Sequence, residues 1–184
     1  MYNYRHLFRI LLPAIIFIIL GYVNISKVVS FEIFTYIYIP ISFGLVIGIV
    51  YWNFHRHKPL LGLFIGLLGT IASYLIGYLG IFLITGSKGL ISVTIISPLL
   101  IFLLYGYLFR IPLSKFSKIV IIIAITILIV YEYSLQSAPK DVHKYLTSHK
   151  IFNFIQIWRI IIAVALGIIV HQKIEIKQKN EGNK

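Results

Sequence analysis

The chain has no cysteine, and only five of its 184 residues are acidic. Disulfides, thiolate metal sites and cysteine nucleophiles are therefore excluded. Charged residues make up 12% of the chain, whereas a soluble domain carries about a quarter. Hydrophobic residues make up 59%. This composition predicts that lipid, and not water, surrounds most of the protein.

The shortage of acids also argues against catalysis. Four of the five lie in predicted loops or in the C-terminal tail, namely Glu32, Asp141, Glu175 and Glu181. Hydrolysis inside a membrane needs a pair of carboxylates, or a nucleophile with a base beside it, and the sequence offers neither. The glycines follow helical spacing, not the spacing of phosphate-binding loops. The sequence thus gives no support for an enzyme, and we expect no cofactor and no metal.

Six apolar segments are each close to the length of about 20 residues that a membrane-spanning helix needs. They cover residues 7–24, 34–53, 60–84, 91–109, 119–136 and 152–171. The connections are short, and none resembles a soluble domain. We therefore predict an all-α integral membrane protein, a compact bundle of six transmembrane helices that forms a single domain over residues 1–184 and ends in a short basic tail, 172–184.

The distribution of lysine and arginine predicts the orientation of this bundle. One side carries eleven basic residues: Arg5, Arg9, Arg56, Lys58, Arg110, Lys115, Lys118, Lys173, Lys177, Lys179 and Lys184. The other side carries five: Lys27, Lys88, Lys140, Lys144 and Lys150. Both termini are expected on the cytoplasmic side, most simply of a bacterial inner membrane. Because the basic residues lie in short tracts between apolar segments, topology explains the net charge of +12 better than nucleic-acid binding does.

Small residues in the third segment recur at helical spacing. They are Gly62, Gly66, Gly69, Ser73, Gly77 and Gly80. Steps of three and four residues keep all of them on one face of a helix. Such a seam lets helices approach closely in lipid, so we predict a helix-packing role for it. A general abundance of glycine in membrane helices explains their number but not their alignment.

Two charged residues fall inside apolar segments, Glu132 in the fifth and Arg159 in the sixth. Their expected depths nearly coincide, so an ion pair in the outer half of the bundle is geometrically feasible. Gln136, Gln156 and Asn153 would extend this polar site towards the surface. Together these five residues form the candidate substrate-binding site. In the alternative, Arg159 snorkels past Trp158 to the headgroups and Glu132 lies at the interface.

Two connections carry polar residues of another kind. His55, Arg56, His57 and Lys58 form a basic loop that we expect to contact anionic lipid headgroups on the cytoplasmic side. The loop 137–151 is mixed in charge. It could form a short amphipathic helix on the outer surface, with Val142, Tyr145 and Leu146 facing the lipid, and could act as a lid over the polar site or as a solvated connector.

Two functional hypotheses follow. The first is a small membrane transporter, or the membrane-embedded substrate-binding subunit of one, with its polar site in the outer half of the bundle. Small six-helix capture subunits of vitamin importers have a similar size and topology, although no motif is shared. The second is a non-catalytic accessory, immunity or pore-forming protein that associates with itself or with other membrane subunits through the glycine seam. A seam buried between the helices of this chain, around a polar cavity, favours transport. A seam that faces lipid favours assembly.

Overall fold

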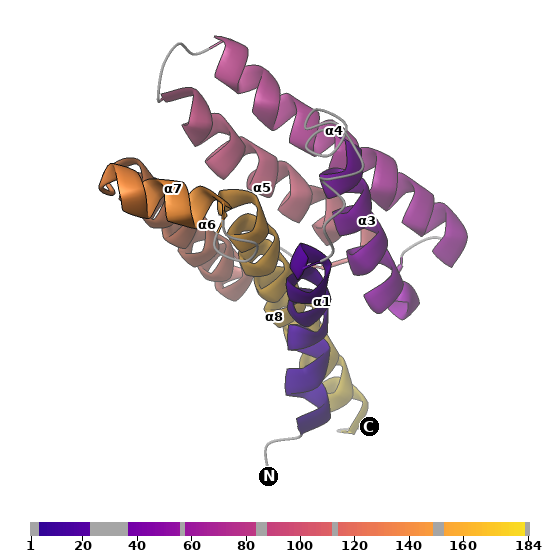
Figure 1. Cartoon of the computed structure of the whole chain (residues 1–184). Helices are drawn as coiled ribbons and strands as arrows, with labels where there is room; N and C mark the ends of the chain where they lie inside the picture. The colour runs from indigo at the N-terminus through magenta and orange to yellow at the C-terminus, as the bar shows by residue number, and fades with distance from the viewer. Residues whose placement is uncertain are drawn as a thin grey trace.

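The computed structural model describes residues 4–22, 37–55, 58–83, 88–111, 114–148 and 153–182. Seven α-helices make up nearly all of this part of the chain (Figure 1). They are α1 (Tyr4–Tyr22), α3 (Ile39–Val50), α4 (Pro59–Leu83), α5 (Lys88–Leu108), α6 (Lys115–Gln136), α7 (Lys140–Ser148) and α8 (Phe154–Gly182), with the short 3-10 helix η3 (Trp52–Phe54) after α3. The all-helical prediction is confirmed, and a helix occupies each of the six apolar segments.

The helices pack as antiparallel neighbours. α4 lies beside α5, α1 beside α8, and α3 beside α4, while α6 packs against both α8 and α5 (Figure 1). α7 lies across the end of α6. The first residues of α1 and the last residues of α8 lie at the same end of the molecule (Figure 1). Successive long helices therefore alternate in direction, as expected where connections are short.

Local sequence explains where several helices begin. Pro40 lies in the first turn of α3, where its missing N–H group leaves no helical hydrogen bond unmade. The Ser114 hydroxyl caps α6 by accepting a hydrogen bond from the Ser117 backbone N–H at 3.1 Å. By contrast, Pro13 and Pro98 lie inside α1 and α5, and both helices continue through them.

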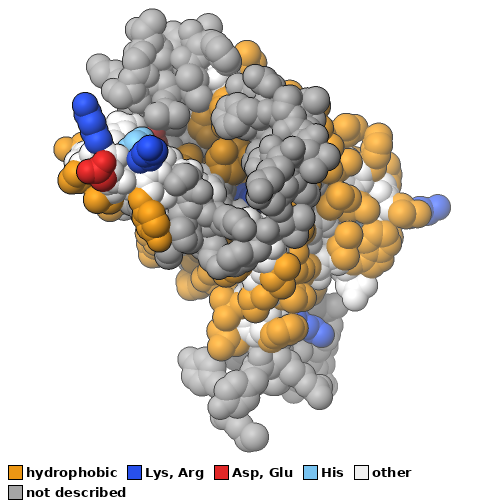
Figure 2. Space-filling model, in the orientation of Figure 1, with side chains coloured by type: hydrophobic (Ala, Val, Ile, Leu, Met, Phe, Trp, Pro, Cys, Tyr) orange, Lys and Arg blue, Asp and Glu red, His pale blue; other side chains and the backbone are white. Residues whose placement is uncertain are grey.

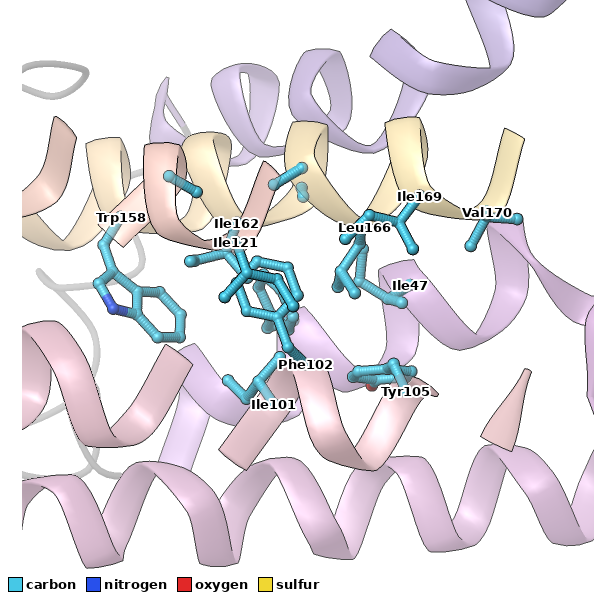
Figure 3. Packing of buried hydrophobic residues seen from close by; sticks show 14 of the residues in the cluster. Ile47, Ile101, Phe102, Tyr105, Ile121, Trp158, Ile162, Leu166, Ile169 and Val170 are labelled. Carbon is cyan, nitrogen blue, oxygen red and sulfur yellow. The ribbon is translucent and has the colours of Figure 1, made fainter. Parts of the chain in front are cut away.

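The core is rich in aromatic rings. Five of them form a continuous row, which we call the aromatic row, from Phe17 through Phe43, Tyr105 and Phe109 to Tyr51, with ring centroids 5.3 to 6.5 Å apart. These are favourable distances for aromatic pairs. The row joins α1, α3 and α5. Figure 3 shows how apolar residues of α8 complete the core from the other side.

The outer surface is also apolar. Large hydrophobic side chains are exposed along three helices: Leu7, Phe8, Leu11, Ile15 and Ile19 of α1, Leu60, Leu61, Phe64, Leu68 and Leu75 of α4, and Ile119, Ile122, Ile123, Ile127 and Val130 of α6. Figure 2 shows apolar side chains over most of the described surface on one face, with a group of charged ones over α7 and isolated basic ones elsewhere. Extended apolar faces of this kind are typical of surfaces that contact a membrane or another protein.

Three helical stretches are long and apolar enough to cross a membrane: Pro59–Leu79 in α4, Lys115–Gln136 in α6 and Phe154–Gln172 in α8. The described apolar parts of α1, α3 and α5 are shorter, at Leu7–Gly21, Ile39–Val50 and Val93–Leu108. The described chain is thus helical, with three apolar helices compatible with a membrane protein.

The structure adds detail to two polar segments of the sequence. Within the segment 137–151, residues Lys140–Ser148 form the helix α7, whose Val142 and Tyr145 side chains are exposed. Val142, Tyr145 and Leu146 follow the i, i+3, i+4 spacing that places them on one face of an amphipathic helix. The basic tail 172–184 is helical as far as Gly182, because α8 continues to that residue without an earlier one that would break it.

Candidate polar site

Arg159 lies in the interior of the protein, with only 3% of its surface exposed. Its Nη1 donates a hydrogen bond to the Ser42 hydroxyl of α3 at 3.1 Å, and its Nη2 donates to the Gln156 side-chain oxygen one turn away on α8. Gln156 in turn donates to the backbone carbonyl of Phe17 in α1. These four residues, which we call the Arg159 cluster, connect three helices through polar side chains.

The Arg159 guanidinium has no acidic partner among the residues that the structure describes. Its Cζ lies 5.4 Å from the centroid of the Phe17 ring, a cation–π distance, and Tyr38 and Tyr74 are near enough to interact with its charge. Its buried Nε has no hydrogen-bond partner within the described ranges. A buried cation is normally paired with an anion, so the Arg159 cluster has a positive charge that neutral groups only partly offset.

Glu132 belongs to a second group of polar residues. It continues the buried face of α6 and is 7% exposed. One of its carboxylate oxygens, Oε2, accepts a hydrogen bond from the Thr94 hydroxyl of α5, and the other, Oε1, accepts one from Gln136 Nε2 at 3.2 Å. These three residues, the Glu132 cluster, tie α6 to α5.

The structure does not support the suggested Glu132–Arg159 ion pair. The two residues are satisfied by different partners, and within the described chain no salt bridge or shared hydrogen-bond partner joins them. Equal depth in two neighbouring helices does not fix the direction in which each side chain points, and packing has turned these two towards different helices. The snorkelling alternative is also wrong, because both Arg159 and Trp158 are almost fully buried.

The remaining predicted site residues have identifiable local roles. The Asn153 side chain accepts a hydrogen bond from the Gln156 backbone N–H at 2.9 Å and so caps the start of α8. Gln136 is exposed and reaches the site only through Glu132. Ser42 and Thr94 were missed by sequence reasoning. Small hydroxyl residues are common in apolar helices, and nothing in their spacing marks them as partners of a charge.

Three glycines of the small-residue seam of α4, Gly66, Gly69 and Gly77, lie against α5 of the same chain. A side chain added at Gly69 would meet Leu104 at 2.7 Å, and one at Gly77 would meet Cβ of Ser97 at 2.7 Å. Gly66 is in ordinary contact range of Tyr105. On this face Ser73 is buried, while the surroundings of Gly80 fall outside the described residues. The seam therefore lets α4 and α5 pack at close range.

His55 in the basic loop points inwards. Its Nε2 lies 3.1 Å from the Gly48 carbonyl, its ring packs against Phe109, and Gly62 leaves the space that the ring occupies. Burial lowers the pKa of His55 below its usual 6.5, although the bond to Gly48 opposes this shift. Lys58 is exposed, and Arg56 and His57 lie outside the described residues.

One large cavity is described, with a volume of about 520 Å³. It lies between the first half of α1, the end of α3 with η3, and the last described side chains of α8. No group of three or more potential metal ligands occurs in the part of the chain that the structure describes.

Comparisons with protein-family models, with curated proteins and with solved structures give no match to this chain. The fold and the two polar clusters therefore define the class without help from relatives. The described part of the chain is all-helical, with apolar helices compatible with a membrane, and its interior holds two charged residues of opposite sign that are not paired with each other.

Proposed function

We propose that this chain is a multi-pass membrane protein with six spans and both termini in the cytoplasm, and that it binds a small anion for transport. It acts alone or as the substrate-binding subunit of a larger transporter. The apolar outer faces of α1, α4 and α6 support the membrane location. The common end of α1 and α8, together with the basic residues that recur on that side, supports the even number of spans (Figure 1).

The buried Arg159 is the observation that carries the binding proposal. Placing a guanidinium at the centre of a membrane costs on the order of 3 kcal/mol on insertion scales. Such a residue is retained mainly where it has a functional use. Its neutral partners position it from three helices, and its Nε is still available. A carboxylate or phosphate would supply the missing charge and take the bidentate geometry that arginine prefers.

The glycine seam gives less support to the alternative of an accessory, immunity or pore-forming assembly. Gly69 and Gly77 are covered by α5 of the same chain, so this surface is not available to another subunit. An assembly would have to use the exposed apolar faces, which lipid covers equally well.

The binding proposal is tested by thermal unfolding of the purified protein in neutral detergent with acetate, succinate, phosphate or sulfate. At least one of these anions is expected to raise the melting temperature of the wild type but not of Arg159→Gln. Lys118→Gln, which removes an exposed charge on α6, is the matched control and keeps the response. A wild type that responds to none of the four anions, or an Arg159→Gln variant that responds as strongly, refutes anion binding at this site.

The topology is tested separately. Because the chain has no cysteine, single cysteines introduced at Lys58 and Lys140 give clean labelling sites. A membrane-impermeant maleimide added to intact cells is expected to label the Lys140 variant and to label the Lys58 variant only after lysis. The reverse pattern, or labelling of both in intact cells, contradicts the proposed orientation.

A further inference from the structure

Both polar and apolar residues line the cavity between α1, α3 and α8. Arg9, Trp52 and Asn53 contribute polar groups, while Leu12 and Val50 contribute hydrocarbon. No aspartate or glutamate is among its lining residues. Its volume of about 520 Å³ falls in the range of about 300–1,000 Å³ that is typical of ligand sites. An amphiphile with an anionic head fits this division of chemistry.

Two contacts fix the wall of the cavity before anything binds. The Tyr51 hydroxyl donates a hydrogen bond to the Arg9 carbonyl at 3.3 Å and so joins α3 to α1. Gly167 allows the backbone of α1 to approach α8, since a side chain at this position would meet the Ile10 carbonyl at 2.8 Å. The space is therefore built into the packing of three helices, and filling it needs no rearrangement of the backbone.

The location of the cavity indicates where the amphiphile would come from. It lies at the end of the bundle where α1 begins and α3 ends, the end that the proposed topology places at the cytoplasmic leaflet. That leaflet is rich in anionic lipids, and an arginine beside an indole ring at the headgroup level favours them. The basic residue Lys115 at the start of α6 belongs to the same end and raises the local concentration of anions.

We propose that this cavity binds one anionic phospholipid of the cytoplasmic leaflet, with its phosphate near Arg9 and Asn53 and the start of an acyl chain along Leu12 and Val50. The inference rests on the proposed membrane location but not on the Arg159 cluster. It assigns to the protein a lipid site that is separate from the solute site.

The two tryptophans of the chain allow a direct test, because Trp52 lines the cavity and Trp158 is buried in the core. In a Trp158→Phe background Trp52 is the sole indole. The purified protein in neutral detergent is titrated with phosphatidylglycerol brominated near the start of its acyl chains, and quenching of Trp52 is measured. Brominated phosphatidylcholine is titrated in parallel, and inorganic phosphate and glycerol phosphate are added as competitors.

Phosphatidylglycerol is expected to quench at lower concentrations than phosphatidylcholine, and neither water-soluble phosphate should displace it. Arg9→Gln should weaken the phosphatidylglycerol response about fivefold, the contribution of one basic residue to the binding of anionic lipid, while Lys118→Gln leaves it within twofold. Val50→Phe, which fills the apolar part, should also weaken it.

Four outcomes overturn the proposal. Equal quenching by the two lipids means that Trp52 meets only bulk annular lipid, a result that leaves the membrane location intact. Displacement by phosphate means that the site takes a free anion. Equal losses in Arg9→Gln and Lys118→Gln mean that only surface charge attracts the lipid. Absence of quenching by either lipid contradicts the membrane location itself.

Discussion

The two polar clusters make a quantitative prediction about energetic coupling. Arg159 donates a hydrogen bond to Ser42, whereas it shares no partner with Glu132. Interhelical hydrogen bonds in membrane proteins contribute about 0.6 kcal/mol on average and at most about 1.7 kcal/mol, and charged donors lie at the upper end. Ser42→Ala and Arg159→Gln should therefore be coupled by about 1.5 kcal/mol. Glu132→Gln and Arg159→Gln should be additive within about 0.5 kcal/mol.

The assay is a pair of double-mutant cycles. Free energies of unfolding are measured for the wild type, the single variants and the two double variants, in mixed micelles with increasing denaturing detergent. Ser42 keeps its own hydrogen bond to the Ile39 carbonyl after Arg159 is changed, at 2.9 Å, so its hydroxyl is not left unpaired in that variant. If the coupling between Glu132 and Arg159 equals or exceeds that between Ser42 and Arg159, the charges are paired and the assignment of partners given above is wrong.

Three further predictions concern local packing, protonation and helix capping. Gly77→Ala should destabilise the protein by about 1–3 kcal/mol, because the added methyl group overlaps Ser97. Gly106→Ala is the control, since nothing lies within 4 Å of its new methyl group, and it should be neutral or stabilising. Both free energies of unfolding are measured by detergent-induced unfolding. Burial lowers the pKa of His55, so the unfolded state binds a proton before the folded state does as the pH falls below about 6.5. The melting temperature should therefore decrease as the pH falls through this range. His55→Gln should flatten this pH profile. Equal slopes in the two proteins would exclude His55 as the cause. Asn153→Ala should lower the free energy of unfolding by about 1 kcal/mol, because it removes the cap of α8. Asn153→Asp should keep the cap and the stability of the wild type. Equal stability of the wild type and both variants would argue against the cap.

The positions of the helices followed from the sequence because hydropathy and length determine them. The apolar run 60–84 became α4 at Pro59–Leu83, and the run 119–136 lies within α6. The seam of α4 was visible as well, since alignment on one helical face depends only on spacing. The partners of Arg159 were not predictable in the same way. They depend on the rotation of each helix about its axis and on the choice of neighbours, and both are decided by packing between residues distant in sequence.

The aromatic row has a consequence for motion. Large rings from α1, α3 and α5 interlock, so none of these helices can slide or rotate without moving the rings of the others. α6 contributes no ring to the row and exposes much of its apolar surface. Its polar attachment to α5 is the contact between Thr94 and Glu132. Opening of the bundle should therefore occur by movement of α6 away from a rigid body of α1, α3 and α5, and hydrogen exchange in α6 should be the first to accelerate in Thr94→Val.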